Sequence, residues 1–373
     1  MAKSIYFVAG EASADNHGAA LMESLRRLDV DLRLLGRGGP RMQAIAGEKF
    51  KNWIDEAAVV GLWEVIKRYG YFQKQFRVTL REINESKPDA VVLIDYPGFN
   101  LRLARALHRQ GGAPKIIYYI SPQVWAWNRG RIKQMARSLD LMLCIFPFEA
   151  DLYNQSGLRT IFVGHPMIDN LRAGKIDIER DPNLIALFPG SRRREVGKIL
   201  PVLIDAAKEL RKQKPNLRFE IAAASEQLAR EIRDMLDGDL QFISIKVGET
   251  AGLMQRAFAG IVASGSATLE ATYFRMPFVL VYKVSWLTYF AARLVVKVKY
   301  LGMPNVLADK EVVPEFIQHR AQPRAVARAV ARLIDNPGAR AQMVFEFDSI
   351  VNKLGQGGAS ERAARAICEE ISC

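Results

Sequence analysis

The sequence has few cysteines and no uninterrupted apolar run long enough to cross a bilayer. Its three cysteines, Cys144, Cys368 and Cys373, lack the spacing of a zinc site, and their odd number argues against a disulfide framework. The longest apolar stretches are too short or too interrupted by charge to span a membrane. We therefore expect a protein of a reducing cytoplasm that meets a membrane only at its surface.

Two further patterns are missing. Residues 1–10 lead directly into an apolar strand without a cleavage site, so we expect no signal peptide. The spacing G-x-G-x-x-G, which follows an early strand in dinucleotide-dependent dehydrogenases, is absent. The sequence therefore argues against a nicotinamide-dependent oxidoreductase.

Basic residues are abundant but scattered. The 373 residues include 53 Lys and Arg against 40 Asp and Glu, a net charge of +13. Such an excess favours a negatively charged partner, either a phosphorylated substrate or an anionic lipid surface. Because no basic block or RNA-binding aromatic pattern occurs, we expect no nucleic-acid partner.

Short apolar runs alternate with helical patterns along the whole chain. This alternation is typical of doubly wound α/β layers with parallel sheets. The polar segment 172–183 is the best linker, so we predict two Rossmann-like domains facing each other across a cleft, at 1–171 and 172–354. The last helix, within 355–373, is expected to fold back onto the first domain. The predicted strands are 4–9, 90–94, 115–120, 141–145, 160–163, 184–188, 219–223, 242–245, 260–263 and 278–282.

The segment 263–270, Ala-Ser-Gly-Ser-Ala-Thr-Leu-Glu, joins a predicted strand to a predicted helix. Small residues at such a junction let a phosphate reach free backbone N–H groups, and the helix dipole favours its charge. Glu270 lies about one turn into the helix, within reach of a ribose hydroxyl. The pattern predicts a nucleotide diphosphate site that includes Ser264, Gly265, Ser266, Ala267, Thr268 and Glu270.

A second candidate turn, Pro-Gly-Ser-Arg at 189–192, follows the predicted strand 184–188. Gly190 and Ser191 can offer N–H groups to a phosphate, and Arg192 can offer two parallel hydrogen bonds. A departing diphosphate gains negative charge, which Arg192 would stabilise. The alternative is an ordinary solvated basic turn.

The first half of the chain places carboxylates after two predicted strands. Glu11, Ser13, Asp15 and Asn16 follow the first strand and could bind sugar or phosphate groups, or form a polar helix start. Asp95 follows the strand 90–94, where it could accept the proton of a sugar hydroxyl or simply cap a helix.

Two tryptophans stand in one loop after the strand 115–120. Ser121, Gln123, Trp125 and Trp127 together suit a sugar or an acyl chain, because aromatic faces bind both. The alternative is a hydrophobic loop that packs into the core, which we expect for one of the two tryptophans more readily than for both.

Three other features give weaker signals. Asn305, Glu315 and Gln318 lie in segments, 302–305 and 312–318, that have the composition of loops and could contact a base or a ribose. Segment 61–80 has apolar residues at helical spacing with basic residues among them, which suits a membrane surface or an ordinary core contact. His17, His108, His165 and His319 form no evident metal set.

Seven segments together resemble the lipid-A-disaccharide synthase family, in that family's order and over nearly the whole chain. They are Gly-Glu-Ala-Ser at 10–13, Asp-Tyr-Pro-Gly-Phe-Asn at 95–100, Tyr-Ile-Ser-Pro-Gln-Val-Trp-Ala-Trp at 119–127, Phe-Glu at 148–149, Val-Gly-His-Pro at 163–166, and the turns at 189–192 and 263–270. The tryptophan-containing segment is the most specific. The turn at 263–270 is shared more widely among GT-B glycosyltransferases.

The resemblance implies an inverting GT-B enzyme that needs no metal or other cofactor. It would join UDP-2,3-diacylglucosamine to 2,3-diacylglucosamine 1-phosphate through a β-1,6 bond and release UDP. It would work on the cytoplasmic face of the inner membrane, against an anionic surface, and as a possible homodimer.

The resemblance also implies roles for individual residues. Arg192 and the turn at 264–270 would bind the donor, and Asn305, Glu315 and Gln318 match polar positions of the nucleotide side. Many family members carry a second aspartate where this chain has Gly98. The catalytic base is therefore expected to be Asp95, with Glu11 or Asp15 as alternatives.

Two other functions remain open from the sequence. Another GT-B glycosyltransferase or a UDP-sugar epimerase would have a similar fold, but an epimerase would act on a soluble sugar and would not need Trp125 and Trp127 exposed. A basic membrane-binding or nucleic-acid-binding protein with a degenerate nucleotide fold would show no turnover, and it leaves the turns at 189–192 and 263–270 unexplained.

Overall fold

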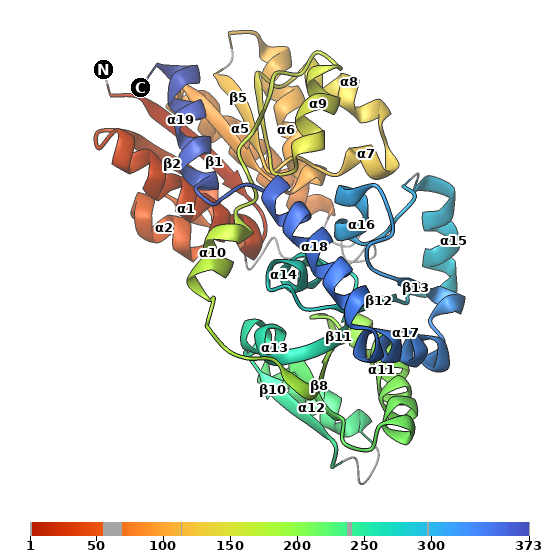
Figure 1. Ribbon diagram of the computed structural model, residues 1–373. Helices are drawn as coiled ribbons and strands as arrows, with labels where there is room; N and C mark the ends of the chain where they lie inside the picture. Colours follow the sequence, from red (N-terminus) through yellow and green to blue (C-terminus); the bar gives the residue numbers. More distant parts are fainter. Residues whose placement is uncertain (1, 55–68, 113, 237–240, 297, 373) are drawn as a thin grey trace. The chain divides into compact units, whose positions relative to one another are not determined.

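The structure, a computed structural model, describes residues 2–54, 69–112, 114–236, 241–296 and 298–372 (Figure 1). The chain divides into two compact units. Unit 1 comprises Met1–Asp169 and Leu354–Cys373, and unit 2 comprises Asn170–Lys353. The chain thus leaves unit 1 after residue 169, where the sequence suggested 171, and returns at residue 354, where it suggested 355.

Unit 1 is built on a parallel sheet of seven strands in the order β3-β2-β1-β4-β5-β6-β7. The strands are β1 (Ser4–Ala9), β2 (Arg33–Gly38), β3 (Lys51–Asn52), β4 (Ala90–Ile94), β5 (Lys115–Tyr119), β6 (Leu141–Cys144) and β7 (Thr160–Phe162). Every residue of β1 and β4 is buried, as expected for central strands covered by helices on both faces.

The helices of unit 1 connect these strands and include the end of the chain. They are α1 (Ala12–Leu28), α2 (Pro40–Ala46), α5 (Tyr69–Ser86), α6 (Pro97–Gln110), α7 (Val124–Trp127), α8 (Gly130–Ala136), α9 (Pro147–Asn154) and α19 (Ala359–Ile371), while α10 (Met167–Ala173) carries the chain into unit 2. The amphipathic pattern at 61–80 falls partly on residues 61–68, which are outside the described residues, and partly on α5.

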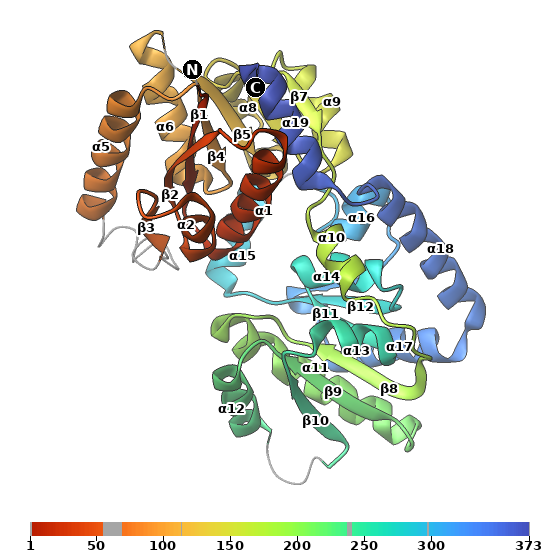
Figure 2. The ribbon, with the colours of Figure 1, turned by 90° about the vertical axis from the view of Figure 1, so that its left-hand side faces the viewer.

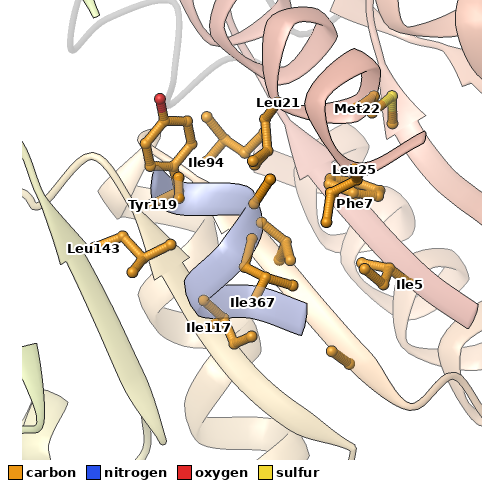
Figure 3. Close-up of a cluster of buried hydrophobic side chains, with 14 of the residues drawn as sticks. Ile5, Phe7, Leu21, Met22, Leu25, Ile94, Ile117, Tyr119, Leu143 and Ile367 are labelled. Carbon is orange, nitrogen blue, oxygen red and sulfur yellow. The ribbon is translucent and has the colours of Figure 1, made fainter. Parts of the chain in front are cut away.

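The C-terminal helix completes the core of unit 1. Figure 2 shows α19 beside α1, and Figure 3 shows Ile367 among Leu21, Leu25 and the strand residues Phe7 and Ile117. Ile367 is fully buried, and burying such a side chain contributes roughly 1.5–3 kcal/mol. Residues more than 300 positions apart in the sequence therefore form one hydrophobic core.

Unit 2 repeats the same strand arrangement with six parallel strands, in the order β10-β9-β8-β11-β12-β13. The strands are β8 (Asp181–Phe188), β9 (Arg218–Ala223), β10 (Ile243–Val247), β11 (Ala257–Ala263), β12 (Phe278–Tyr282) and β13 (Glu315–Ile317). The helices are α11 (Arg193–Gln213), α12 (Glu226–Met235), α13 (Thr250–Arg256), α14 (Ser266–Tyr273), α15 (Trp286–Val295), α16 (Met303–Ala308), α17 (Pro323–Asp335) and α18 (Pro337–Lys353), with a 3-10 turn at Gln318–Arg320.

Two parallel sheets, each with helices between its strands, confirm the predicted fold class of two Rossmann-like domains. In each sheet the strand order reverses beside the first strand, between β1 and β4 in unit 1 and between β8 and β11 in unit 2. Ligands of such sheets bind at this reversal, outside the carboxyl ends of the strands. The fold therefore marks one candidate position in each unit.

Three local expectations need correction. Met303 begins α16, with Pro304 in the first turn where a missing N–H costs nothing, so 302–305 is not a loop throughout. Part of 312–318 is also regular, because Glu315–Ile317 pairs with β12 as an edge strand. Cys144 is a buried free thiol, but Cys368 is disulfide-bonded. The odd number of cysteines argued against a framework of several disulfides, but it did not exclude one disulfide.

None of the helices formed by the described residues is both long enough and apolar enough to cross a membrane.

Candidate active site

Two carboxylates follow the ends of β1 and β4, where the strand order of unit 1 reverses. Ala9 of β1 pairs with Ile94 of β4, so Glu11 and Asp95 follow neighbouring strand ends. Gly10 lies between them in a confined position, because a Cβ there would overlap the ring of Tyr96. The sequence thus brings Glu11 and Asp95 to one edge of the sheet, where the side chain of Glu11 is exposed and that of Asp95 is half-buried.

The backbone at Asp95 adopts a strained conformation that its neighbours hold in place. Asp95 and Tyr96 have φ angles of 46° and 50°, in the left-handed region that non-glycine residues rarely occupy. Tyr118 Oη donates to the carbonyl oxygen of Asp95 at 2.5 Å, and Asn100 Nδ2 donates to the same oxygen at 2.7 Å. Strain of this kind costs roughly 1–3 kcal/mol per residue and clusters at functional sites. Tyr118 was assigned no role from the sequence, and Asn100 was noted only as the last residue of the segment 95–100.

The surroundings of Asp95 make it a stronger base than an ordinary aspartate. Burial raises the pKa of its carboxyl group to about 6, and the negative charge of Glu11 adds to the shift, while the backbone N–H of Tyr96 opposes it. At neutral pH the group is mostly ionised and still has a useful affinity for a proton. A base with a pKa close to the working pH is suited to proton transfer.

Asp15, the other carboxylate predicted here, is occupied by backbone groups. Its carboxylate accepts hydrogen bonds at 3.0 Å from the N–H groups of Gly39, Arg41 and Met42, at the start of α2. Its side chain is only 3% exposed. A carboxylate at a helix N-terminus satisfies otherwise unpaired donors, so the geometry gives Asp15 a capping role. Ser13 and Asn16, in the first turns of α1, are exposed.

The tryptophan loop is anchored by a buried glutamate. Glu149 lies in the first turn of α9 and is fully buried. Its carboxylate accepts hydrogen bonds from Ser121 Oγ at 2.5 Å and Trp125 Nε1 at 2.8 Å. Burial raises the pKa of Glu149 to about 7, against the effect of these hydrogen bonds. Ser121 and Trp125, predicted to contact the acceptor, therefore face a protein group in this structure.

The other two loop residues face outward. Gln123 is exposed, and Trp127 is 39% exposed with the guanidinium of Arg131 lying 4.7 Å from the centre of its ring. One tryptophan thus packs inside and the other is accessible. Glu149 itself was missed as the anchor, although Pro147 and Glu149 at the first and third helical positions are a recognisable helix start.

In unit 2, the turn after β8 is built on a glycine with a positive φ angle. Gly190 has a φ of 109°, which favours glycine, and a side chain there would press on Glu195. Ser191 is exposed, and the Arg192 side chain is 71% exposed. Arg192 forms an ion pair with Glu195, at 3.2 Å across the first turn of α11, and most of its side chain faces solvent.

The turn after β11 lies beside it, because β11 pairs with β8. Gly265 precedes α14, and a Cβ built on it would meet no atom within 4 Å. Gly265 and Ser266 are exposed, Ser264 and Ala267 are half-buried, and the first N–H groups of a helix have no partner within that helix. Thr268 is buried and binds the carbonyl oxygen of Gly265 through its Oγ1 at 2.7 Å.

Glu270 lies in α14, one helical turn after Ser266. Burial raises the pKa of its carboxyl group, and a hydrogen bond with Ser266 opposes that shift. The site therefore combines open helix N–H groups, a half-buried carboxylate and an exposed arginine at the strand reversal of unit 2.

The three polar residues predicted to contact a base or ribose form hydrogen bonds with backbone groups of unit 2. Asn305 is fully buried and accepts from the N–H groups of Val312 and Val313, both at 2.8 Å. Glu315 accepts from the N–H of Gly302 at 2.8 Å. Gln318 is 2% exposed and exchanges two hydrogen bonds with the backbone of Val284. All three fix the local fold.

Among residues 2–372, apart from the short stretches outside the described ranges, no three His, Cys, Asp or Glu side chains gather closely enough to hold a metal ion.

The comparisons with known proteins agree on one family. A family model described as lipid-A-disaccharide synthetase matches residues 5–367. A protein named lipid-A-disaccharide synthase from Geobacter sulfurreducens is 38% identical over 375 residues, covering 98% of this chain and 97% of its own. One of the same name from Coxiella burnetii is 34% identical over 373 residues, covering 98% of each chain.

Solved structures share the fold at low identity. The structure of UDP-GlcNAc 2-epimerase from Neisseria meningitidis bound to UDP-GlcNAc has a TM-score of 0.65 and 13% identity, and the match covers 98% of this chain and 100% of that one. MurG from Acinetobacter baumannii has a TM-score of 0.58 and 15% identity, with 98% and 99% covered. At these identities the structures establish the architecture alone.

Proposed function

Because this chain belongs to the lipid-A-disaccharide synthase family, and so is a glycosyltransferase, we propose how its residues carry out that reaction. The donor is UDP-2,3-diacylglucosamine and the acceptor is 2,3-diacylglucosamine 1-phosphate. The products are a β-1,6-linked disaccharide 1-phosphate and UDP. The curated relatives do not favour the alternative of a UDP-sugar epimerase, and the solved epimerase structures resemble this chain at low identity, in fold alone.

One observation supports this assignment above the others. Each unit carries its chemically distinctive residues at the strand reversal of its own sheet, carboxylates in unit 1 and two glycine-containing turns that lead into helices in unit 2. A transferase that joins two sugars needs two such sites. We assign the acceptor to unit 1 and the donor to unit 2.

The donor site consists of the turns after β8 and β11. The diphosphate receives N–H groups from Gly190, Ser191 and the start of α14, and the guanidinium of Arg192 binds it as well. Glu270 lies within one helical turn of this position and is suited to a ribose hydroxyl. As the bond to the sugar breaks, negative charge builds up on UDP, and Arg192 with the dipole of α14 stabilises it.

The acceptor site is centred on Asp95. Its carboxylate takes the proton from the 6-hydroxyl of the acceptor, and the oxygen attacks the anomeric carbon of the donor from the side opposite UDP. The new bond therefore has inverted configuration, and the proton remains on Asp95 until solvent removes it. Glu11 keeps the proton affinity of Asp95 high through its charge, and the exposed Ser13, Asn16, Gln123 and Trp127 contact the acceptor sugar and its chains.

No metal takes part in this scheme, because Arg192 and the helix N-terminus supply the positive charge that the leaving diphosphate needs. The expected measurement is a rate that does not change when a strong chelator is added to enzyme purified without metal.

We further propose that the protein works on the cytoplasmic face of the inner membrane. Its net charge of +13 suits an anionic surface, and Trp286, Leu287 and Phe290 expose apolar area on unit 2. Binding to vesicles that contain anionic lipid, weakened by salt, tests this location. A homodimer is compatible with the same scheme, and sedimentation measures it.

The reaction is tested by supplying purified protein with both lipids in detergent and identifying the product by mass spectrometry. A disaccharide 1-phosphate that forms only when both lipids are present supports the proposal. Release of UDP from the donor alone, or no product from well-dispersed lipids, contradicts it.

A further inference from the structure

The helix that follows β12 and precedes α16 along the chain of unit 2 has large apolar side chains exposed to solvent (Figure 1). This helix, α15, is almost entirely apolar in sequence, yet Leu287 is 83% exposed and Phe290 is 59% exposed. An apolar helix that is left at the surface marks a contact with another molecule.

Side chains from the β13 region hold both ends of the segment that carries α15. Before the helix, Gln318 binds the N–H of Val284 at 3.1 Å and its carbonyl oxygen at 3.0 Å. After the helix, the carboxylate of Glu315 accepts from the N–H groups of Leu301 and Gly302, at 3.0 and 2.8 Å. The segment is thus fixed at its ends, while the helix between them has little protein around it.

Under this segment lies a cavity of about 1010 Å³, which we call the α15 cavity. Its volume is at the upper end of ligand pockets, which span roughly 300–1,000 Å³. Three basic side chains, Arg293, Lys299 and Arg320, and two carboxylates, Glu311 and Glu315, also border it. The residues that give it an apolar character are Tyr282, Tyr289, Ala292, Val296, Tyr300 and Ile317.

The α15 cavity adjoins the proposed donor turns. Ser264, in the turn after β11, donates its backbone N–H to the carbonyl oxygen of Val281 at 3.2 Å, and the next residue, Tyr282, lines the cavity. The charges of Glu195 and Arg192 both act on the hydroxyl of Tyr282, whose pKa is raised chiefly by burial. Because neighbouring strands lie about 4.8 Å apart, the ends of β12 and β13 are within roughly 10 Å of the turn after β11.

We propose that the α15 cavity binds an acyl chain of the donor lipid. This inference rests on the proposed function, since it takes the donor to be a diacylated sugar nucleotide. With the diphosphate at the turns after β8 and β11, a sugar ring spans the short distance toward β12, and the chains attached to it enter the cavity. Removing methylene groups from water supplies the binding energy.

The experiment compares two tryptophan substitutions on the same helix. Ala292→Trp fills part of the α15 cavity, whereas Val295→Trp adds bulk on the same helix at a position that is 45% exposed and is not among the residues lining the cavity. For each protein, the dissociation constants of UDP and of UDP-2,3-diacylglucosamine are measured in the same detergent. The Michaelis constants of both lipids are measured as well.

We expect Ala292→Trp to weaken binding of the diacylated donor at least tenfold and to leave UDP binding within twofold of the original protein. Retained UDP binding shows that unit 2 is folded. Val295→Trp should change neither constant. Equal donor binding by Ala292→Trp and the original protein overturns the inference, and so does a rise in the Michaelis constant of the acceptor alone, which would assign the cavity to the acceptor chains.

The same measurements separate this inference from the proposed function. If the original protein binds UDP but makes no disaccharide from the two lipids, the proposed function fails. If it makes the disaccharide and Ala292→Trp does so with an unchanged donor constant, only the acyl-chain site fails.

Discussion

Replacing Glu11 by Gln should move the acidic limb of the pH–rate profile to lower pH. Asp95 acts as a base only when it is deprotonated, so the rate rises with pH through its pKa of about 6. Roughly 9% of the group is ionised at pH 5 and roughly 91% at pH 7, which predicts about a tenfold difference in turnover between these two pH values. Removing the negative charge of Glu11 lowers the pKa of Asp95, so Glu11→Gln retains more of its activity at pH 5.

The shift has an upper bound. Burial is the larger cause of the raised pKa and remains in the variant, so the limb should stop above 3.8, the ordinary value for an aspartate. The sign for stability is opposite to that for activity. Because the folded protein holds this proton more tightly than the unfolded chain does, the contribution of Asp95 to stability falls as pH rises from about 4 to about 6.

The assay is turnover at saturating concentrations of both lipids between pH 5 and 8. The acceptor phosphate also titrates in this range, but it does so equally with every variant, so differences between variants report the protein. Glu23→Gln removes an exposed carboxylate of the same helix, α1, and should leave the profile unchanged. An acidic limb at the same pH in Glu11→Gln and the original protein would refute the electrostatic link between Glu11 and Asp95.

Three further predictions address other parts of the account. Arg192→Ala should weaken UDP binding about tenfold by calorimetry, the modest loss expected of an exposed charged hydrogen-bond donor, whereas Arg233→Ala should not; equal affinity in both would remove Arg192 from the donor site. Glu149→Ala should lower the free energy of unfolding in urea by about 3 kcal/mol, because two buried donors lose their acceptor, and a loss near zero would contradict that. Asp15→Ala should cost about 1–2 kcal/mol of stability as a lost helix cap; a large fall in turnover at unchanged stability would instead make Asp15 part of the chemistry.

The strands that could be predicted from the sequence are those made almost entirely of apolar residues. Strands such as β1 and β4 are buried on both faces, so their sequences are continuous apolar runs that are easily recognised. β2 was missed because it contains two arginines and two glycines. Arg37 is buried there with partners from α5, among them Glu82 at 3.1 Å from its Nε and Gln75, whose Oε1 accepts from its Nη1 at 2.6 Å, and no local pattern reveals partners so far away in the sequence.

The candidate site shows a similar division. Residues directly after strands, such as Asp95 and Arg192, could be predicted because a parallel sheet places its ligands at the carboxyl ends of the strands. Polar residues inside apolar segments were harder to interpret. Asn305 and Gln318 have the composition of ligand contacts, but their amides bind backbone groups of segments that only the folded chain brings near. A sequence cannot distinguish a polar group that binds a ligand from one that replaces a backbone partner.

The most direct test of the account is to measure turnover and UDP affinity together for Asp95→Asn. The account places the base in unit 1 and the donor in unit 2, so turnover should fall roughly 10²- to 10⁴-fold, as for the loss of a general base, with the dissociation constant of UDP unchanged. Turnover within a few fold of the original protein would contradict the assignment of the base to Asp95. A parallel loss of UDP affinity would contradict the division of the two substrates between the units.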